Sequence, residues 1–135
     1  MEWKAEYATG IQNIDDQHRK ILELMTLFEG LSGGAGEQIA MHQLILRTRK
    51  FMEFHFSVEE SLMRLLPYTP HSAVHRAEHG YVLANLADLE GQARLEVDKD
   101  ELVPLMRHLL FDHIVGSDKY FARHARDKWR DFAAH

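Results

Sequence analysis

The chain has 135 residues, no cysteine and a formal net charge of -5 with its histidines neutral. We expect residues 1–135 to form a single domain without disulfides or thiolate metal sites. No block of basic residues suggests nucleic-acid binding, and no apolar run is long enough to span a membrane. Because the first residues also lack the apolar stretch of a signal peptide, the cytoplasm is the expected location.

The N-terminal part of the sequence predicts an arm followed by a helix. Residues 1–14 are expected to form an irregular arm that carries two aromatic side chains, Trp3 and Tyr7. Asp15 or Asp16 is expected to cap the first helix, because a carboxylate accepts hydrogen bonds from the free N–H groups of a first turn. The helix should run to about Leu31 and be stopped by "GLSGGAGE", since consecutive glycines are poor helix formers.

Three further helices are expected along the chain. The spacing of apolar residues predicts helices over about 38–66 and 70–90, separated by "PYTP", in which Thr69 is a plausible cap. A fourth helix should start at an Asp98 cap and run through about His113.

Four amphipathic helices with short connections predict an all-α fold, an up-down-up-down four-helix bundle. The bundle should cover residues 15–118, followed by a short helical tail at 119–135. The inward face of the third helix should begin at Val74.

Polar side chains coincide with the inward faces of all four predicted helices. They are His18 on the first helix, His55 and Glu59 on the second, His75 and His79 on the third, and His113 on the fourth. One inward histidine is usually a core residue with a hydrogen-bond partner, but buried carboxylates need compensating charge and no lysine or arginine lies on these faces. The set predicts a metal site, and imidazole with carboxylate ligands suits iron, manganese or zinc, with enough ligands for two ions.

Asp118 lies five residues after His113. In a regular helix five residues turn the side chain roughly 140° away from the first, at about 100° per residue. Both side chains can point inward only if the helix loosens between them, and Gly116 makes such a break credible. We therefore expect an irregularity at 114–118, of the π-bulge type; the alternative is that Asp118 is a surface residue.

Taken together, the motifs resemble one known family. From about residue 3 to residue 122 the sequence resembles the hemerythrins, specifically the bacteriohemerythrins. The matching pieces are Trp3, "IDDQH" (14–18), "HFSVEE" (55–60), "HRAEH" (75–79) and "HIVGSD" (113–118).

The resemblance implies a hemerythrin-like bundle that holds two non-heme iron ions. By this resemblance the ligands are His75, His79 and His113 on one iron, His18 and His55 on the other, and Glu59 and Asp118 as bridges together with an oxo or hydroxo group. It implies reversible binding of dioxygen, end-on at an open position of the iron with two histidines, for oxygen storage, delivery or sensing. Azide and nitric oxide are further small ligands to expect.

Reversible binding requires a dry pocket, because water and protons would promote oxidation of the irons. The candidates for its lining are Ile21, Leu22, Met25, Phe51, Leu109 and Ile114. Ordinary core packing is the alternative role of these residues. Leu109 stands where members of the family often have tryptophan. No inward acid is evident beside the open position, which favours a binding protein over an enzyme.

Two questions stay open at the level of sequence. Asp15 and Gln17 are candidates to orient ligands from outside the metal shell, and simple capping of the first helix is the alternative for both. The alternative functions are a di-iron oxidase, peroxidase or nitric-oxide-handling enzyme, or an oxygen-sensing module whose tail at 119–135 contacts a protein partner.

Overall fold

The computed structural model describes residues 1–32, 36–65, 70–92 and 98–133, except the side chains of residues 70, 117 and 128–133. The elements in chain order are η1 (Ala5–Tyr7), α1 (Gln12–Glu29), α2 (Gln38–Met63), α3 (Pro70–Gln92), α4 (Lys99–Met106), η2 (Arg107–Phe111), η3 (Ile114–Asp118) and α5 (Lys119–Ala133). The first of these is a 3₁₀ turn, while η2 and η3 are π-helical. The described residues contain helices and no strand, as the sequence predicted.

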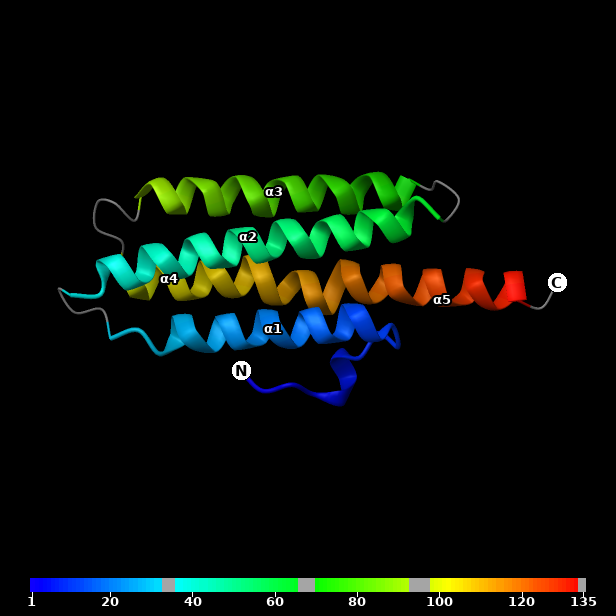
Figure 1. Ribbon diagram of the computed structural model, residues 1–135, viewed down its shortest axis with the longest axis horizontal. Coiled ribbons are helices and arrows are strands. Elements are labelled where there is room, and N and C mark those ends of the chain that lie inside the picture. The colour runs from blue at the N-terminus through cyan, green and yellow to red at the C-terminus, as the bar shows by residue number, and fades with distance from the viewer. Residues whose placement is uncertain (33–35, 66–69, 93–97, 134–135) are drawn as a thin grey trace.

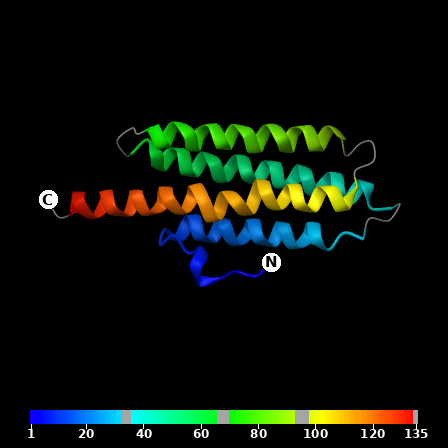
Figure 2. The same ribbon diagram turned by 180° about the vertical axis from the view of Figure 1, so that it is seen from behind.

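The helices form the expected up-down-up-down bundle. Figure 1 shows α1, α2 and α3 running in alternating directions, with α4, η2, η3 and α5 forming one continuous fourth rod beside them. The reverse view in Figure 2 shows that α5 extends past the ends of the other three helices. The predicted tail is therefore a continuation of the fourth helix.

The first helix begins earlier than predicted, and neither aspartate caps it. Its N-cap is Ile11, and the carboxylate of Asp15 reaches back to the arm instead. That carboxylate accepts hydrogen bonds from the backbone N–H of Thr9 at 2.8 Å, from the Thr9 hydroxyl at 2.7 Å and from the N–H of Gly10 at 3.3 Å. Gly10 has a φ of 84°, so the chain turns sharply there and leaves N–H groups for Asp15 to satisfy.

The boundaries of the other helices are close to those expected. Helix α2 ends at Met63, three residues before the predicted end, and Pro70 opens α3 as predicted. The proposed cap Thr69 lies outside the described residues. Asp98 caps α4 as predicted, since its side chain accepts a hydrogen bond from the N–H of Asp100 at 2.9 Å.

The predicted irregularity at 114–118 is confirmed, because η3 covers those residues. In a π-helix each N–H bonds to the carbonyl five residues earlier, so residues five apart lie on one face. His113 and Asp118 can therefore both point into the bundle although they are five residues apart. The second π-helical stretch, η2, was not predicted.

Two apolar clusters pack at different levels of the bundle. The larger includes Ile21, Phe56 and Ile114, and the smaller contains Ile14, Met63, Phe121 and Ala125. On each of α1, α2 and the fourth rod, a buried polar residue lies in sequence between members of the two clusters: His18, Glu59 and Asp118 respectively. The polar site therefore lies within the bundle, between two apolar layers.

One predicted core position is wrong. Val74 is 53% exposed, and the inward face of α3 instead runs from His75 through His79 and Val82. A side chain one residue before an inward histidine is turned about 100° from it, which carries Val74 out of the core.

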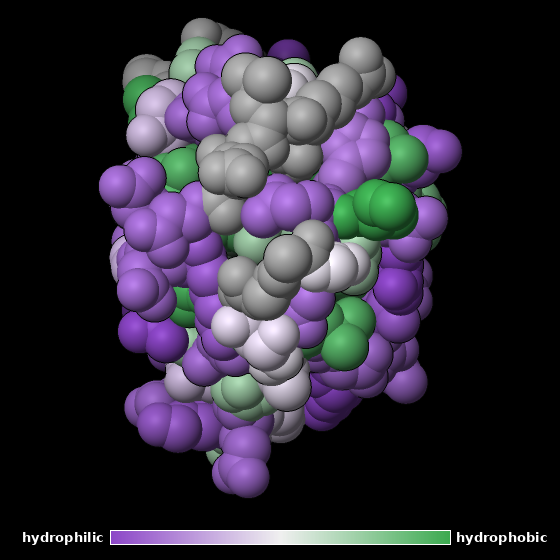
Figure 3. Space-filling model, turned by 90° about the vertical axis from the view of Figure 1, so that its left-hand side faces the viewer, coloured by the Kyte–Doolittle hydropathy of each residue, from purple (hydrophilic) through white to green (hydrophobic). Residues whose placement is uncertain are grey.

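One end of the bundle has a mostly polar surface. Figure 3 shows the end of the bundle at the left of Figure 1, where hydrophilic residues predominate and apolar ones are scattered. Among the described residues, no helix is both long and apolar enough to cross a bilayer.

Candidate metal centre

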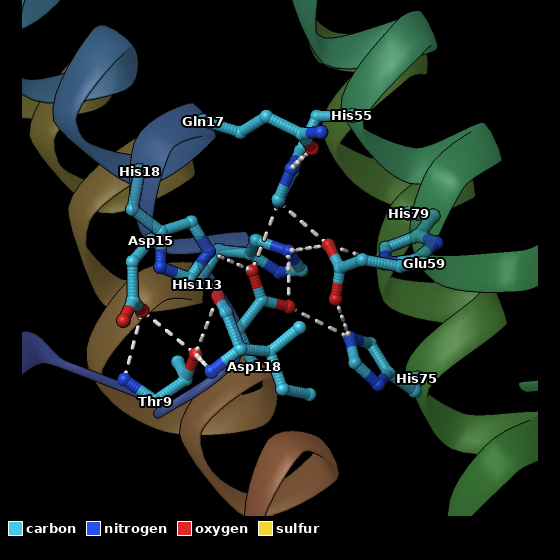
Figure 4. Close-up of polar contacts among 11 residues, drawn as sticks. Thr9, Asp15, Gln17, His18, His55, Glu59, His75, His79, His113 and Asp118 are labelled. Atoms are coloured by element: carbon cyan, nitrogen blue, oxygen red, sulfur yellow. Dashed lines mark hydrogen bonds and ion pairs between the residues drawn. The ribbon is translucent and has the colours of Figure 1, made fainter. Parts of the chain in front are cut away.

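All seven side chains predicted as ligands meet inside the bundle (Figure 4). Every one is buried, and the most exposed residue among them, His113, is only 6% exposed. The seven are His18, His55, Glu59, His75, His79, His113 and Asp118. Each of the four rods contributes at least one of them.

Asp118 is the central acceptor. Its Oδ2 lies 2.6 Å from Nε2 of His18 and 3.0 Å from Nε2 of His55. Its Oδ1 lies 2.9 Å from Nε2 of His75 and 2.7 Å from Nε2 of His113. One carboxylate thus contacts histidines from all four rods of the bundle.

Glu59 faces the same group of nitrogens from α2. Its Oε1 lies 2.6 Å from Nε2 of His55, 3.2 Å from that of His113 and 3.8 Å from that of His79. Its Oε2 lies 3.4 Å from Nε2 of His75. All five imidazoles therefore present Nε2, the same ring atom, to the two carboxylates.

Without a metal, protons on the imidazoles neutralise these carboxylates. Burial lowers the pKa of His55 and His75, but hydrogen bonds to Asp118 and Glu59 outweigh it and raise each pKa to about 9. For His113 the charge of Asp118 outweighs burial and raises the pKa to about 10. The pKa of Asp118 falls well below its usual value, because the charge of His113 and hydrogen bonds overcome burial. Protonated imidazoles can therefore supply compensating charge to the two carboxylates when no metal is bound.

Unpartnered atoms show that the residues nevertheless fit a metal. Both ring nitrogens of His79 are buried without a hydrogen-bond partner, and so is Oε2 of Glu59. Burial lowers the pKa of His79 to about 3, so its ring is neutral and keeps a lone pair at neutral pH. An unbound buried lone pair is unfavourable, and a metal ion would use it.

The donor atoms fall into two unequal groups that share Asp118. Glu59, His75, His79, His113 and Asp118 can each offer one atom within 4.8 Å of the others, and so can His18, His55 and Asp118. Imidazole and carboxylate together suit iron, manganese or zinc. The division into three and two histidines is the one that the sequence resemblance implied.

The residues outside the ligand set take roles that the sequence indicated only in part. Gln17 contacts a candidate ligand, in line with its predicted role: its Oε1 accepts a hydrogen bond from Nδ1 of His55 at 2.7 Å (Figure 4). Asp15 instead accepts hydrogen bonds from Thr9 and Gly10 of the arm, so it acts neither as a cap of α1 nor through these bonds on a candidate ligand.

Two neighbours of His79 were missed. Phe56 stacks on its ring with centroids 3.9 Å apart and planes 10° apart, and Oε2 of Glu60 lies 3.7 Å from its Nδ1. Both come from "HFSVEE", where the second of two adjacent glutamates, four residues after a phenylalanine, was the available signal.

The residues predicted to line an oxygen pocket pack in the larger apolar cluster. Phe51 is partly buried against it, and the others are buried: Ile21, Leu22, Met25, Leu109 and Ile114. A surface hollow of about 260 Å³ beside α3 is lined in part by Leu109 and by the candidate ligand His113. His113 thus borders both the buried site and this hollow.

Comparison with known proteins gives one family. The model of the hemerythrin HHE cation binding domain matches residues 9–125. The bacteriohemerythrin of Stenotrophomonas maltophilia is 29% identical over 97% of this chain and 85% of its own length. That of Pseudomonas paraeruginosa is 31% identical over 86% of this chain and 75% of its own.

A more distant relative is the bacteriohemerythrin of Clostridium acetobutylicum, 25% identical over 88% of this chain and 96% of its own length. No solved structure gave a significant match. Since the family model spans most of the bundle and every candidate ligand, the chain belongs to the hemerythrin HHE cation-binding family.

Proposed function

We propose that the chain binds dioxygen reversibly at two iron ions, for oxygen storage, delivery or sensing. Glu59 and Asp118 would bridge the ions together with an oxo or hydroxo group, since each contacts histidines of both donor groups. The observation that carries the proposal is the meeting of five Nε2 atoms around two buried carboxylates. Iron would supply the electrons that dioxygen takes on binding and returns on release.

The unequal donor groups support a binding role. The group of His18, His55 and Asp118 has fewer protein donors than the other, so a metal held there keeps room for an exchangeable ligand. The role of the chain at this position is to keep donors fixed and water out. Ile21, Leu22 and Met25 follow His18 on the same helix and are buried, which suits them to line the pocket on that side.

Nearby polar groups also favour binding over turnover. The Asp15 carboxylate accepts hydrogen bonds from Thr9, and the buried Thr48 hydroxyl donates to the Leu44 carbonyl at 2.8 Å. The Thr9 and Thr48 hydroxyl protons are therefore engaged in hydrogen bonds to other groups of the chain. An enzyme that cleaves an O–O bond needs a free proton donor.

The test is to load the protein with iron, reduce it without oxygen, and then admit air while recording the visible spectrum. We expect a coloured form that appears with air and disappears when oxygen is removed, through repeated cycles. Immediate, irreversible oxidation with release of peroxide would contradict reversible binding and favour an oxidase.

A further inference from the structure

The ligand histidines differ in what holds their outer nitrogen. Nδ1 of His55 donates to the amide oxygen of Gln17, a neutral acceptor from α1. Nδ1 of His79 faces Glu60, a carboxylate from α2, at 3.7 Å. Nδ1 has no hydrogen-bond partner in His18, His75 or His79, but in His79 it has the Glu60 carboxylate within ion-pair distance.

The ring of His79 is already turned for this contact. Phe56 stacks flat on it and is itself 1% exposed, so the plane of the ring is fixed by packing. In that plane Nε2 points toward Glu59 and Nδ1 toward Glu60, on opposite edges of the ring. A metal on Nε2 would place the remaining proton on Nδ1, facing the Glu60 carboxylate.

The remaining gap can close by movement of one side chain. A hydrogen bond needs roughly 2.7–3.2 Å, so Glu60 must approach by less than about 1 Å. Its side chain is 32% exposed, at the edge of the site, where a change of rotamer meets little resistance.

We propose that Glu60 and Gln17 are unequal positioning residues, one for each metal. A carboxylate that accepts the N–H of a ligating imidazole raises the basicity of that ligand, and a neutral amide does so less. A more basic ligand stabilises the more oxidised metal. Glu60 therefore lowers the reduction potential of the three-histidine metal, and Gln17 leaves the potential of the two-histidine metal higher.

The inference rests on the metal centre of the proposed function, and four variants test it: Glu60→Leu, Glu60→Gln, Gln17→Glu and the control Glu53→Gln. Glu53 lies on the same helix and pairs with Arg49 at the surface, so its variant removes the same charge away from His79. The measurements are iron affinity by competition with a chelator and the potentials of the two reduction steps.

We expect Glu60→Leu to weaken iron binding by about tenfold to a hundredfold, as loss of such outer partners does. Glu60→Gln keeps an acceptor oxygen, so it should retain more affinity while raising the lower potential. Gln17→Glu should lower the higher potential, and Glu53→Gln should change neither quantity.

Unchanged affinity in Glu60→Leu, or equal potential shifts in Glu60→Gln and Glu53→Gln, would overturn the inference. Absence of iron from the wild-type protein would overturn the proposed function as well. Two bound irons without reversible oxygen binding would overturn the proposed function alone.

Discussion

Two segments of the bundle each supply one histidine and one carboxylate, and they do so with different backbones. In α2, His55 and Glu59 are four residues apart on a regular helix. In the fourth rod, His113 and Asp118 are five apart, and η3 is π-helical. The spacing of the polar residues therefore decides the local helix type, because both pairs must face the same buried site.

Removing the Asp118 carboxylate, which the π-helical segment η3 supplies, should have the largest effect on iron binding and stability. Asp118→Ala removes contacts to four histidines and leaves protonated imidazoles in the core without their partner. We expect loss of bound iron and a metal-free protein destabilised by about 3–5 kcal/mol. Iron analysis and denaturant unfolding measure the two effects.

Glu59→Ala is the matched variant in the regular helix α2. It should also lower bound iron and the stability of the metal-free protein, but by less than Asp118→Ala. Asp112→Ala, at an exposed position of the same rod as Asp118, is the control and should change neither quantity. A fully iron-loaded Asp118→Ala protein would refute the central role of this residue.

Exchanging the two spacings tests whether each backbone accommodates only its own. Inserting one alanine after Ser57 places His55 and Glu59 five apart in a helix with no π turn, so we expect severe loss of iron. Deleting Gly116 gives His113 and Asp118 the regular spacing of four, so iron binding should be better retained. The deletion converts the π turn into a regular one, so Asp118 and the residues after it, among them Phe121 and Ala125, keep their faces, and the melting temperature should fall less than in the insertion variant.

Iron content and thermal unfolding of the two variants, side by side, provide the measurement. Equal iron loss in both would show that the site does not depend on which spacing each backbone can accommodate.

The remaining effect is a pH dependence of stability, which is restricted to the metal-free protein. The pKa of His55 and of His75 rises from 6.5 to about 9 on folding, so the resulting stability is present below pH 6.5 and is lost as pH approaches 9. One such group contributes about 3 kcal/mol, at about 1.4 kcal/mol for each pH unit. Melting temperatures at pH 6 and pH 9 should therefore differ for the metal-free protein.

Metal-loaded protein is the comparison, because metal already holds these histidines deprotonated and removes the dependence. If the metal-free protein were equally stable at pH 6 and pH 9, His55 and His75 would not form charged pairs with the buried carboxylates. His108→Gln, a change at an exposed histidine, should leave the pH profile unaltered.

Much of the fold could be predicted because the apolar residues and the inward polar residues of each helix follow the same three- and four-residue spacing. The inward positions of His18, His55 and His75 follow from residues three and four apart, and the irregularity near Gly116 follows from one awkward spacing. The second π-helical stretch has no such signal, since "RHLLF" would suit a regular helix equally well.

Contacts between helices were harder to predict, because they depend on the rotation of each helix about its axis. Gln17 and His55 are 38 residues apart, and only the packed bundle brings them to 2.7 Å. Glu60 likewise adjoins Glu59 in sequence yet faces the outer edge of His79. Asp15 was misread because the turn at Gly10 competes for its carboxylate.

The fluorescent side chain of Trp3, in the arm, is connected by contacts to two helices that carry candidate ligands. Trp3 packs edge-on against Tyr7, whose ring meets Phe111 at the end of η2. Trp3 also lies under the guanidinium of Arg19, the residue next to His18 in the chain. Tryptophan emission from the arm would therefore follow changes in the two rods nearest to it, so filling of the site could be timed by fluorescence in unlabelled protein.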